Sequence, residues 1–235
     1  MNFSTSANHA DGAGLIGLII CSVVILFGAI AYFSYVARKR RREAVALLAQ
    51  SLGLRFAPDK DRGLAKKYEK LDELRKGSNR YAFNVLRGDY EGHPVELFDY
   101  HYQITTSNGK SSSTRHYFLN VLVCRLPRRF PELRIYREGF FEKVVQFIGF
   151  EDIHFESAEF SKRYTVRSKD RKFAYDFVHA RMMDFLMRGP DLNIEVEGEV
   201  LALVSRSRLD PPEIRGYLTG LMHLRKLMPE YLFTR

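Results

Sequence analysis

Residues 95–124, VELFDYHYQITTSNGKSSSTRHYFLNVLVC, decide the fold. Two runs of β-branched and aromatic residues, 95–102 and 116–124, flank the polar segment 105–114, whose serines, threonines, asparagine and glycine are typical of a turn. This arrangement predicts two antiparallel strands joined by a flexible loop. Nearly every side chain of the second run is apolar, which predicts a central strand covered on both faces.

Elements on either side extend this hairpin into a domain. A strand over 81–86 and a turn over 87–94 complete a three-strand meander, and the Pro-containing segment 126–131 is interpreted as a link. The patterns further predict strands at 133–136, 153–155, 164–167, 193–196 and 200–204, and helices at 43–52, 59–77, 139–148, 170–187 and from Asp210. Segregated strands and helices indicate an α+β fold, in which helices pack on a mainly antiparallel sheet.

The start of the last helix carries a clear sequence signal. Asp210 is expected to be its N-cap, Pro211 its first residue and Glu213 the second half of a capping box. The two strands before this helix are predicted to turn at Glu197–Gly198.

An uncharged segment precedes the domain. Residues 13–37, AGLIGLIICSVVILFGAIAYFSYVA, would measure about 37 Å as a helix, which exceeds the roughly 30 Å hydrocarbon core of a bilayer. Tyr32 and Tyr35 lie near its C-terminal end, where aromatic side chains settle at a membrane interface. A basic cluster follows directly and consists of Arg38, Lys39, Arg40, Arg41 and Arg42. This order predicts one transmembrane helix with these tyrosines and bases at the membrane interface.

The charges around this helix predict its orientation. Residues 1–12 contain no Lys or Arg, so they lack the positive start of a cleavable signal peptide. The positive-inside rule then places residues 1–12 outside the cell, 13–37 in the plasma (inner) membrane and the basic flank 38–42 on the cytoplasmic side. Residues 43–235 are expected to form one cytoplasmic α+β domain.

The net charge of the chain is concentrated at the membrane flank. Five bases against Asp11 give residues 1–42 a charge of +4, which leaves +5 of the total +9 for residues 43–235. So mild an excess argues against nucleic acid as a partner. The two cysteines, Cys21 and Cys124, lie in separate apolar runs and are not expected to form a disulfide.

The strand 97–102, LFDYHY, offers candidate catalytic residues. Side chains alternate along a strand, so Asp99 and His101 are expected to project side by side, away from the neighbouring aromatic side chains. With His93 and His116 on adjacent segments, this neighbourhood could form a metal site or an acid–base pair. Its spacing matches no dense ligand or nucleophile motif, and no motif implies a cofactor. Asp99, His101 and His116 therefore remain weak catalytic candidates.

An arginine cluster follows the central strand. Its members are Arg125, Arg128, Arg129, Arg134 and Arg137. Guanidinium groups pair with phosphate, so the cluster is a candidate anion-binding site for lipid headgroups, phosphate or nucleic acid. No ribonucleoprotein motif or interleaved aromatic platform accompanies it, and a solvated or membrane-facing surface explains it as well.

Three segments carry a resemblance to known proteins: AQSLGLRF at 49–56, LFDYHY at 97–102 and the block 133–170, which contains DIHFES and EFSKRY. With the preceding apolar helix, this order resembles a family of bacterial single-pass membrane-anchored proteins of unknown function. The resemblance implies a bacterial origin and tethering to the inner membrane, and it implies no activity or catalytic residue.

The sequence favours a non-enzymatic, single-pass membrane protein whose cytoplasmic domain binds a protein partner or the membrane surface. Its expected partners are the lipid bilayer and a protein. One alternative is a membrane-tethered enzyme that uses Asp99, His101 and His116. The other is weak binding of phosphate or nucleic acid through the arginine cluster.

Overall fold

The computed structural model describes residues 7–137, 151–190, 192–205 and 207–234. Two compact units divide the chain, Met1–Val45 and Ala46–Arg235, and each is described by itself. The first consists of the greater part of one long helix, and the second is the α+β domain predicted from the sequence.

Helix α1 (Ala7–Ser51) contains both the uncharged segment and the helix predicted at 43–52. It continues through the basic cluster and ends before Gly53, whose φ of +69° is the left-handed conformation that glycine adopts most readily. Large apolar side chains on it are exposed, including Phe27 and Phe33. Among the described residues, α1 is the one helix long and apolar enough to cross a membrane.

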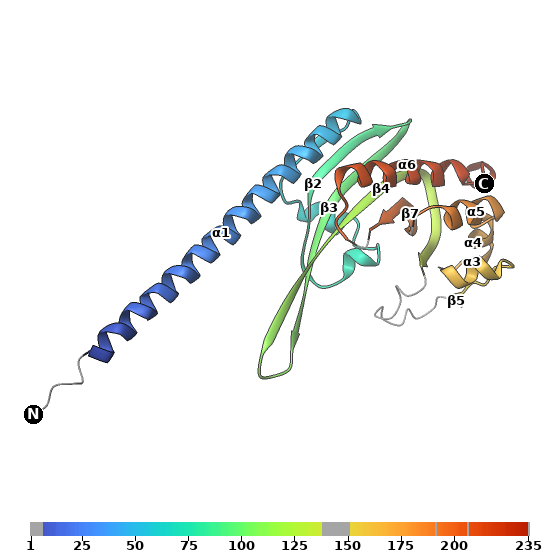
Figure 1. The fold of residues 1–235 in the computed structure, drawn as a ribbon. Coiled ribbons are helices and arrows are strands. Elements are labelled where there is room, and N and C mark those ends of the chain that lie inside the picture. The colour runs from blue at the N-terminus through green and yellow to red at the C-terminus, as the bar shows by residue number, and fades with distance from the viewer. Residues whose placement is uncertain (1–6, 138–150, 191, 206, 235) are drawn as a thin grey trace, which may run out of the picture. The chain divides into compact units, whose positions relative to one another are not determined.

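The domain is built on a seven-stranded sheet in which every pairing is antiparallel (Figure 1). The strands are β1 (Arg55–Ala57), β2 (Ser78–Tyr90), β3 (His93–Ser107), β4 (Ser112–Arg137), β5 (Glu151–Asp152), β6 (Tyr164–Ser168) and β7 (Asn193–Val204). The predicted meander is confirmed, since β2, β3 and β4 are neighbours in the sheet. Strands β3 and β4 are paired as far as Ser107 and Ser112, which gives the long hairpin seen in Figure 1.

Strand β4 organises the sheet. Its first half pairs with β3 on one edge, and its last residues, Leu133–Arg137, pair with β6. Strand β7 runs along the other edge beside both halves. The segment 126–131, predicted to be a link, instead lies within β4, and Glu197–Gly198 lies within β7. Register shifts between Arg125 and Leu133 absorb the extra residues, so both positions are irregularities of continuous strands.

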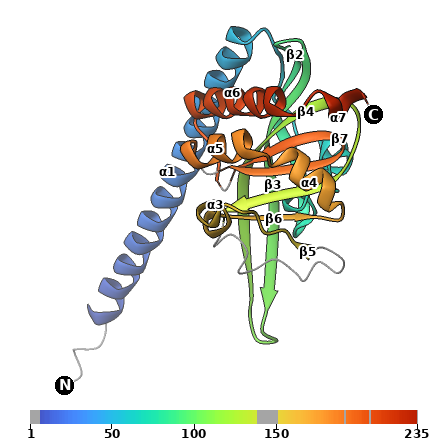
Figure 2. The ribbon, with the colours of Figure 1, turned by 90° about the vertical axis from the view of Figure 1, so that its right-hand side faces the viewer.

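The helices are distributed over the two faces of the sheet. They are α2 (Arg62–Lys67), the 3₁₀ helix η1 (Glu73–Arg75), α3 (Ala158–Arg163), α4 (Arg171–Phe177), α5 (Ala180–Arg188), α6 (Pro211–Leu227) and α7 (Tyr231–Thr234). Helices α3 to α6 contact β4, β6, β7 or one another and cover one face (Figure 2). The segment that contains α2 and η1 covers the other face.

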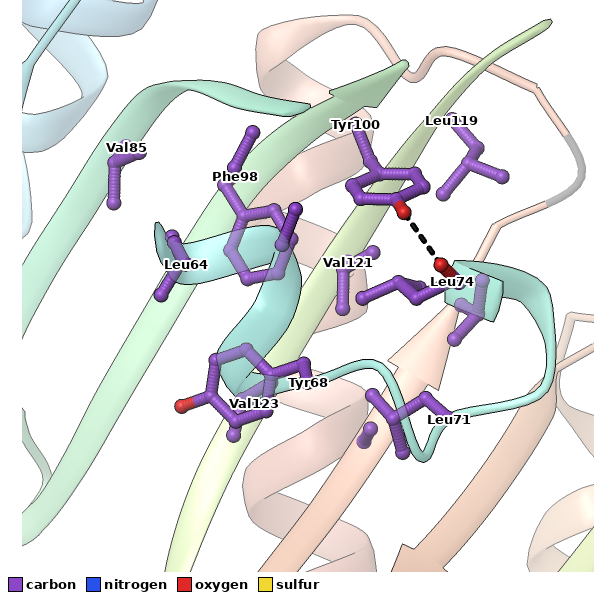
Figure 3. Close-up of a cluster of buried hydrophobic side chains, with 14 of the residues drawn as sticks. Leu64, Tyr68, Leu71, Leu74, Val85, Phe98, Tyr100, Leu119, Val121 and Val123 are labelled. Atoms are coloured by element: carbon purple, nitrogen blue, oxygen red, sulfur yellow. Dashed lines mark hydrogen bonds between the residues drawn. The ribbon is translucent and has the colours of Figure 1, made fainter. Parts of the chain in front are cut away.

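The core beneath α2 and η1 follows from the alternation of side chains along the strands. Phe98, Tyr100 and Tyr102 point to the same face, as predicted, and pack with apolar residues of β4 and β7 (Figure 3). Leu74 completes the contact, because its carbonyl oxygen accepts a hydrogen bond of 2.6 Å from the hydroxyl of Tyr100. The 3₁₀ helix is thereby fixed to the centre of the sheet.

Two predicted helices are shorter than expected. The helix predicted over 170–187 is divided into α4 and α5, because His179 has an extended backbone and caps α5 by accepting a hydrogen bond from Met182. The stretch predicted as helical over 59–77 forms only α2 and η1. Asp61 caps α2 by accepting a hydrogen bond from the backbone N–H of Leu64, and Tyr68 is the C-cap that ends the helix.

Of the remaining secondary-structure predictions, one is confirmed and the others differ from the structure. The capping box of Asp210 and Glu213 is confirmed at the start of α6. In place of a strand over 153–155 the structure has β5, which comprises two residues. Helix α3, which Ser157 caps, was not predicted. The helix expected over 139–148 lies outside the described residues.

Candidate functional site

The predicted alternation in β3 places Asp99 and His101 on the face opposite the core of Figure 3. His101 is buried, and its Nε2 lies 2.9 Å from Nδ1 of His116, which β4 brings alongside in the hairpin. The Nδ1 atom of His101 lies 3.1 Å from the carbonyl oxygen of Asn79. A carbonyl only accepts, so in neutral His101 this nitrogen carries the proton and Nε2 accepts from His116.

The environment of His101 favours this neutral form. Burial lowers the pKa of the His101 imidazole, and the nearby positive charges of His116 and Lys60 act in the same direction. The hydrogen bond to Asn79 opposes this effect in part. The hydrogen bonds to Asn79 and His116 thus hold His101 in a setting that favours its neutral form.

Aromatic rings surround the histidine pair. The His101 ring lies 4.5 Å from that of Tyr81 and 4.8 Å from that of Phe118, measured between centroids, and Phe118 in turn contacts Phe83. Phe118 is 40% exposed. We call Tyr81, Phe83, His101, His116 and Phe118 the aromatic patch.

Cations border the aromatic patch. The ammonium of Lys60 lies 4.4 Å above the ring of Tyr81, and the guanidinium of Arg208 lies 5.6 Å from the ring of Phe83. Such cation–π contacts hold positive charge at the rim of an aromatic surface.

Asp99 does not join the histidine pair. Its carboxylate accepts hydrogen bonds from the side-chain amides of Asn84 at 2.9 Å and Asn120 at 2.7 Å, and it forms an ion pair with Arg208 at 3.3 Å. These partners belong to β2, to β4 and to the segment before α6. Asp99 thus connects three parts of the domain.

The other histidine considered from the sequence is remote. His93 is paired with Tyr90 at the start of β3, eight residues before His101, which corresponds to about 26 Å along a strand. Within the described ranges, no group of three or more His, Cys, Asp or Glu side chains could hold a metal ion.

The arginine cluster is divided by the structure. Arg134 is buried, whereas Arg125 and Arg129 are exposed, and the guanidinium of Arg128 lies 5.8 Å from the ring of Phe130. Arg137 is half-buried at the end of β4, paired in register with Tyr164.

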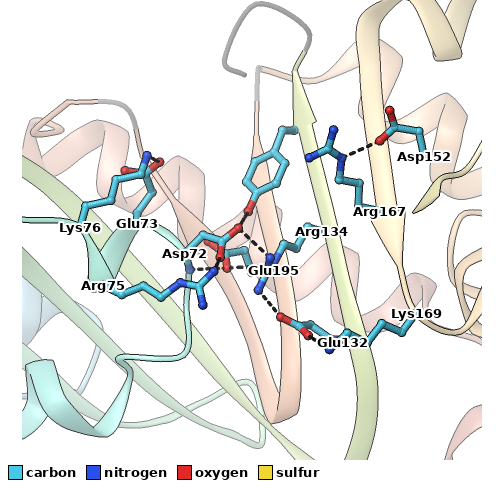
Figure 4. Close-up of polar contacts among 11 residues, drawn as sticks. Asp72, Glu73, Arg75, Lys76, Glu132, Arg134, Asp152, Arg167, Lys169 and Glu195 are labelled. Carbon is cyan, nitrogen blue, oxygen red and sulfur yellow. Dashed lines mark hydrogen bonds and ion pairs between the residues drawn. The ribbon is translucent and has the colours of Figure 1, made fainter. Parts of the chain in front are cut away.

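Arg134 belongs to a buried charge network (Figure 4). It forms ion pairs with Asp72 at 3.0 Å, with Glu195 at 3.9 Å and with Glu132. The hydroxyl of Tyr136 donates to Asp72 at 2.7 Å. Sequence reasoning missed Asp72 and Glu195, because 123 residues separate them and neither belongs to a recognisable motif.

The carboxyl group of Glu195 in this network has a raised pKa. Burial, followed by the negative charge of Asp72, raises its pKa to about 8, although the backbone N–H of Asp72 donates to it and Arg134 lies nearby. Its second carboxyl oxygen is buried and has no hydrogen-bond partner among the described residues. Protonation at neutral pH removes the cost of burying this charge.

The irregular region shared by β4 and β7 forms a cleft of about 260 Å³. Four cations line it, namely Lys67, Lys70, Arg125 and Arg129, together with Glu197 and Glu199. We call this the basic cleft. Gly198 also lines it and has a φ of +58°, a left-handed conformation that allows β7 to bulge there.

Two larger cavities, of about 610 and 640 Å³, lie among helices α4 to α7. His179 lines the first, where its Nε2 lies 2.9 Å from the carbonyl oxygen of Leu227. In the second, the rings of Phe185 and His223 are 4.5 Å apart. In both places the histidine has a local structural contact.

The predicted membrane-interface residues lie on α1. Tyr32 and Tyr35 are exposed, as are Arg38, Lys39, Arg40 and Arg42. Their location at a membrane interface remains a prediction from the sequence.

Comparison with known proteins gives a similarity of fold. No family model matches the chain, and no curated protein matches it. The crystal structure of the mycobacterial trehalose monomycolate transport factor A, TtfA, is similar, with a TM-score of 0.60 and 15% identity. The match covers 82% of this chain and 96% of that one. The chain therefore shares the α+β architecture of that transport factor.

Proposed function

We propose that this chain is a bacterial single-pass membrane protein whose cytoplasmic domain is a non-enzymatic module that binds a protein partner through the aromatic patch. In this account α1 spans the inner membrane with its N-terminus outside. The absence of Lys and Arg before the apolar segment and the five bases after it support this orientation.

The arrangement around Asp99 is the observation that carries the binding role. An acid–base relay needs a carboxylate that orients the histidine, but Asp99 is held by two amides and Arg208 while His101 is oriented by a backbone carbonyl. What this region presents to solvent is Phe118 and His116, in an aromatic setting. Aromatic side chains with arginine at the rim are typical of the energetic centres of protein interfaces.

The similarity to TtfA supports the setting. That protein is a transport factor, and its fold covers most of this chain. We place the present domain in an equivalent setting, as an accessory to transport at a membrane, with a membrane protein as the partner of the aromatic patch.

Site-specific crosslinking tests this proposal. A photo-reactive phenylalanine analogue at position 118 of the full chain, irradiated in membranes of the host bacterium, is expected to capture a distinct protein. Tyr175 is a matched control, because it is 43% exposed and lies on α4, away from the patch. Equal capture at 118 and 175, or none at 118 in a correctly inserted protein, would reject the aromatic patch as the binding surface.

A further inference from the structure

We propose that the basic cleft is a binding site for a phosphate group, either of a lipid headgroup or of a soluble phosphate compound. This inference concerns the middle of β7, around Gly198, and uses none of the aromatic patch residues. It rests on the charge of the cleft, on the state of its cations and on its size.

The charge balance of the cleft is positive. Four cationic side chains line it against two carboxylates, Glu197 and Glu199. Lys67 is also paired with Glu96 at 2.8 Å, so an excess of one positive charge remains. The cleft is formed where β4 and β7 both depart from regular pairing, between Arg125 and Leu133. Bulges commonly re-aim side chains at functional positions, and here Arg125 and Arg129 of β4 line the same hollow as Lys67 and Lys70 of the α2 segment.

Arg129 is the central group. Within the parts of the chain that the structure describes, its side chain makes no ion pair or hydrogen bond, while its guanidinium lies near Gly198, which also lines the cleft. A guanidinium presents a planar fork of N–H donors that matches two oxygens of a phosphate. Arg129 is thus available to an incoming anion.

Two of the neighbouring cations are held only weakly, whereas Lys67 is paired with Glu96 at 2.8 Å. Lys70 lies 3.8 Å from Glu197, and Arg125 lies 3.2 Å from Glu199, in pairs whose cations are more than half exposed. Exposed ion pairs of this kind contribute little to stability. An incoming phosphate can therefore take over Lys70 and Arg125 at little cost, which gives it three cations with Arg129.

The volume of the cleft limits the ligand. Sites for larger organic ligands measure roughly 300 to 1,000 Å³, and this cleft of about 260 Å³ lies below that range. It fits a phosphate group with the first atoms of its ester, and leaves the remainder of the ligand outside.

Thermal unfolding of the full chain in zwitterionic phosphatidylcholine nanodiscs tests the site with inorganic phosphate as the probe. Phosphate is expected to raise the unfolding temperature more than chloride at equal ionic strength, because a ligand of the native state stabilises it. In the double variant Lys70→Gln/Arg129→Gln the apparent Kd should rise at least about tenfold, since two charge-assisted contacts are lost. Arg115→Gln is the control, because Arg115 is exposed on the β3–β4 hairpin, and it should respond like the wild type.

An equal response of all variants, or an equal effect of chloride, would overturn the proposal. Arg129→Gln alone provides the same comparison if the double variant fails to fold. Nanodiscs that contain phosphatidylglycerol distinguish the two sources. If that lipid abolishes the response to inorganic phosphate, the site takes a lipid headgroup, and if the response persists the site takes a soluble phosphate group.

Discussion

The substitution Asp99→Ala measures whether this carboxylate serves the fold, as its contacts indicate. The change removes two hydrogen bonds from amides to a buried carboxylate, each worth about 1.5–3 kcal/mol. The ion pair with Arg208 adds less than about 1 kcal/mol, because that side chain is 28% exposed and solvent screens the pair. The free energy of unfolding should therefore fall by about 3–6 kcal/mol, because the buried amides and Arg208 lose the group that pairs them.

The assay is urea unfolding of the full chain in detergent, followed by near-ultraviolet circular dichroism of the tyrosines, which reports on the domain. Asp89→Ala is the matched control, because Asp89 is an exposed carboxylate in β2, and its effect should stay within about 0.5 kcal/mol. A loss below about 1 kcal/mol for Asp99→Ala would refute the structural role of Asp99 and reopen its assignment to an acid–base pair with His101.

Three further substitutions test other parts of the structure. Glu195→Gln should flatten the dependence of the free energy of unfolding on pH. In the wild type the folded pKa of about 8 lies above the ordinary value of 4.5, so stability is lost as pH rises between about 5 and 8. An unchanged slope in the variant would contradict this. Tyr100→Phe should cost about 1 kcal/mol in urea unfolding, since the carbonyl oxygen of Leu74 keeps a second donor, and a loss above about 3 kcal/mol would show a larger role. Gly77→Ala should lower the free energy of unfolding by more than about 2 kcal/mol in the same assay, because the new Cβ would lie 2.2 Å from a backbone oxygen of β3. Gly92→Ala is the control and should cost about 1 kcal/mol, because Gly92 has a similar φ but open space around it. Equal losses would contradict the close approach at Gly77.

Local patterns in the sequence were sufficient for much of the fold. The alternation of Phe98, Asp99 and Tyr100 assigned each side chain to the correct face, because the two-residue period of a strand does not depend on tertiary context. The capping box at Asp210 located α6 for a similar reason, since its hydrogen bonds join residues three positions apart.

Contacts between distant segments could not be predicted in this way. In the sequence Arg134 is one member of an arginine cluster that suggests an exposed surface. In the structure it is buried, because Asp72 and Glu195 from distant parts of the chain form ion pairs with it. The irregular pairing of β4 with β7 likewise depends on both strands, so a proline-containing segment of one strand resembled a link. The basic cleft arises from that irregularity and was recognised from the sequence only as a run of arginines.

We infer that one helix holds this domain on the cytoplasmic side of a membrane, and cysteine labelling in spheroplasts provides a direct test. Cys21 is replaced by serine and buried Cys124 is kept, and single cysteines are introduced as Ser4→Cys or Lys110→Cys, the latter at the exposed tip of the β3–β4 hairpin. A membrane-impermeant maleimide should label position 4 in intact spheroplasts and position 110 only after lysis. Labelling of position 110 in intact spheroplasts would contradict the claim.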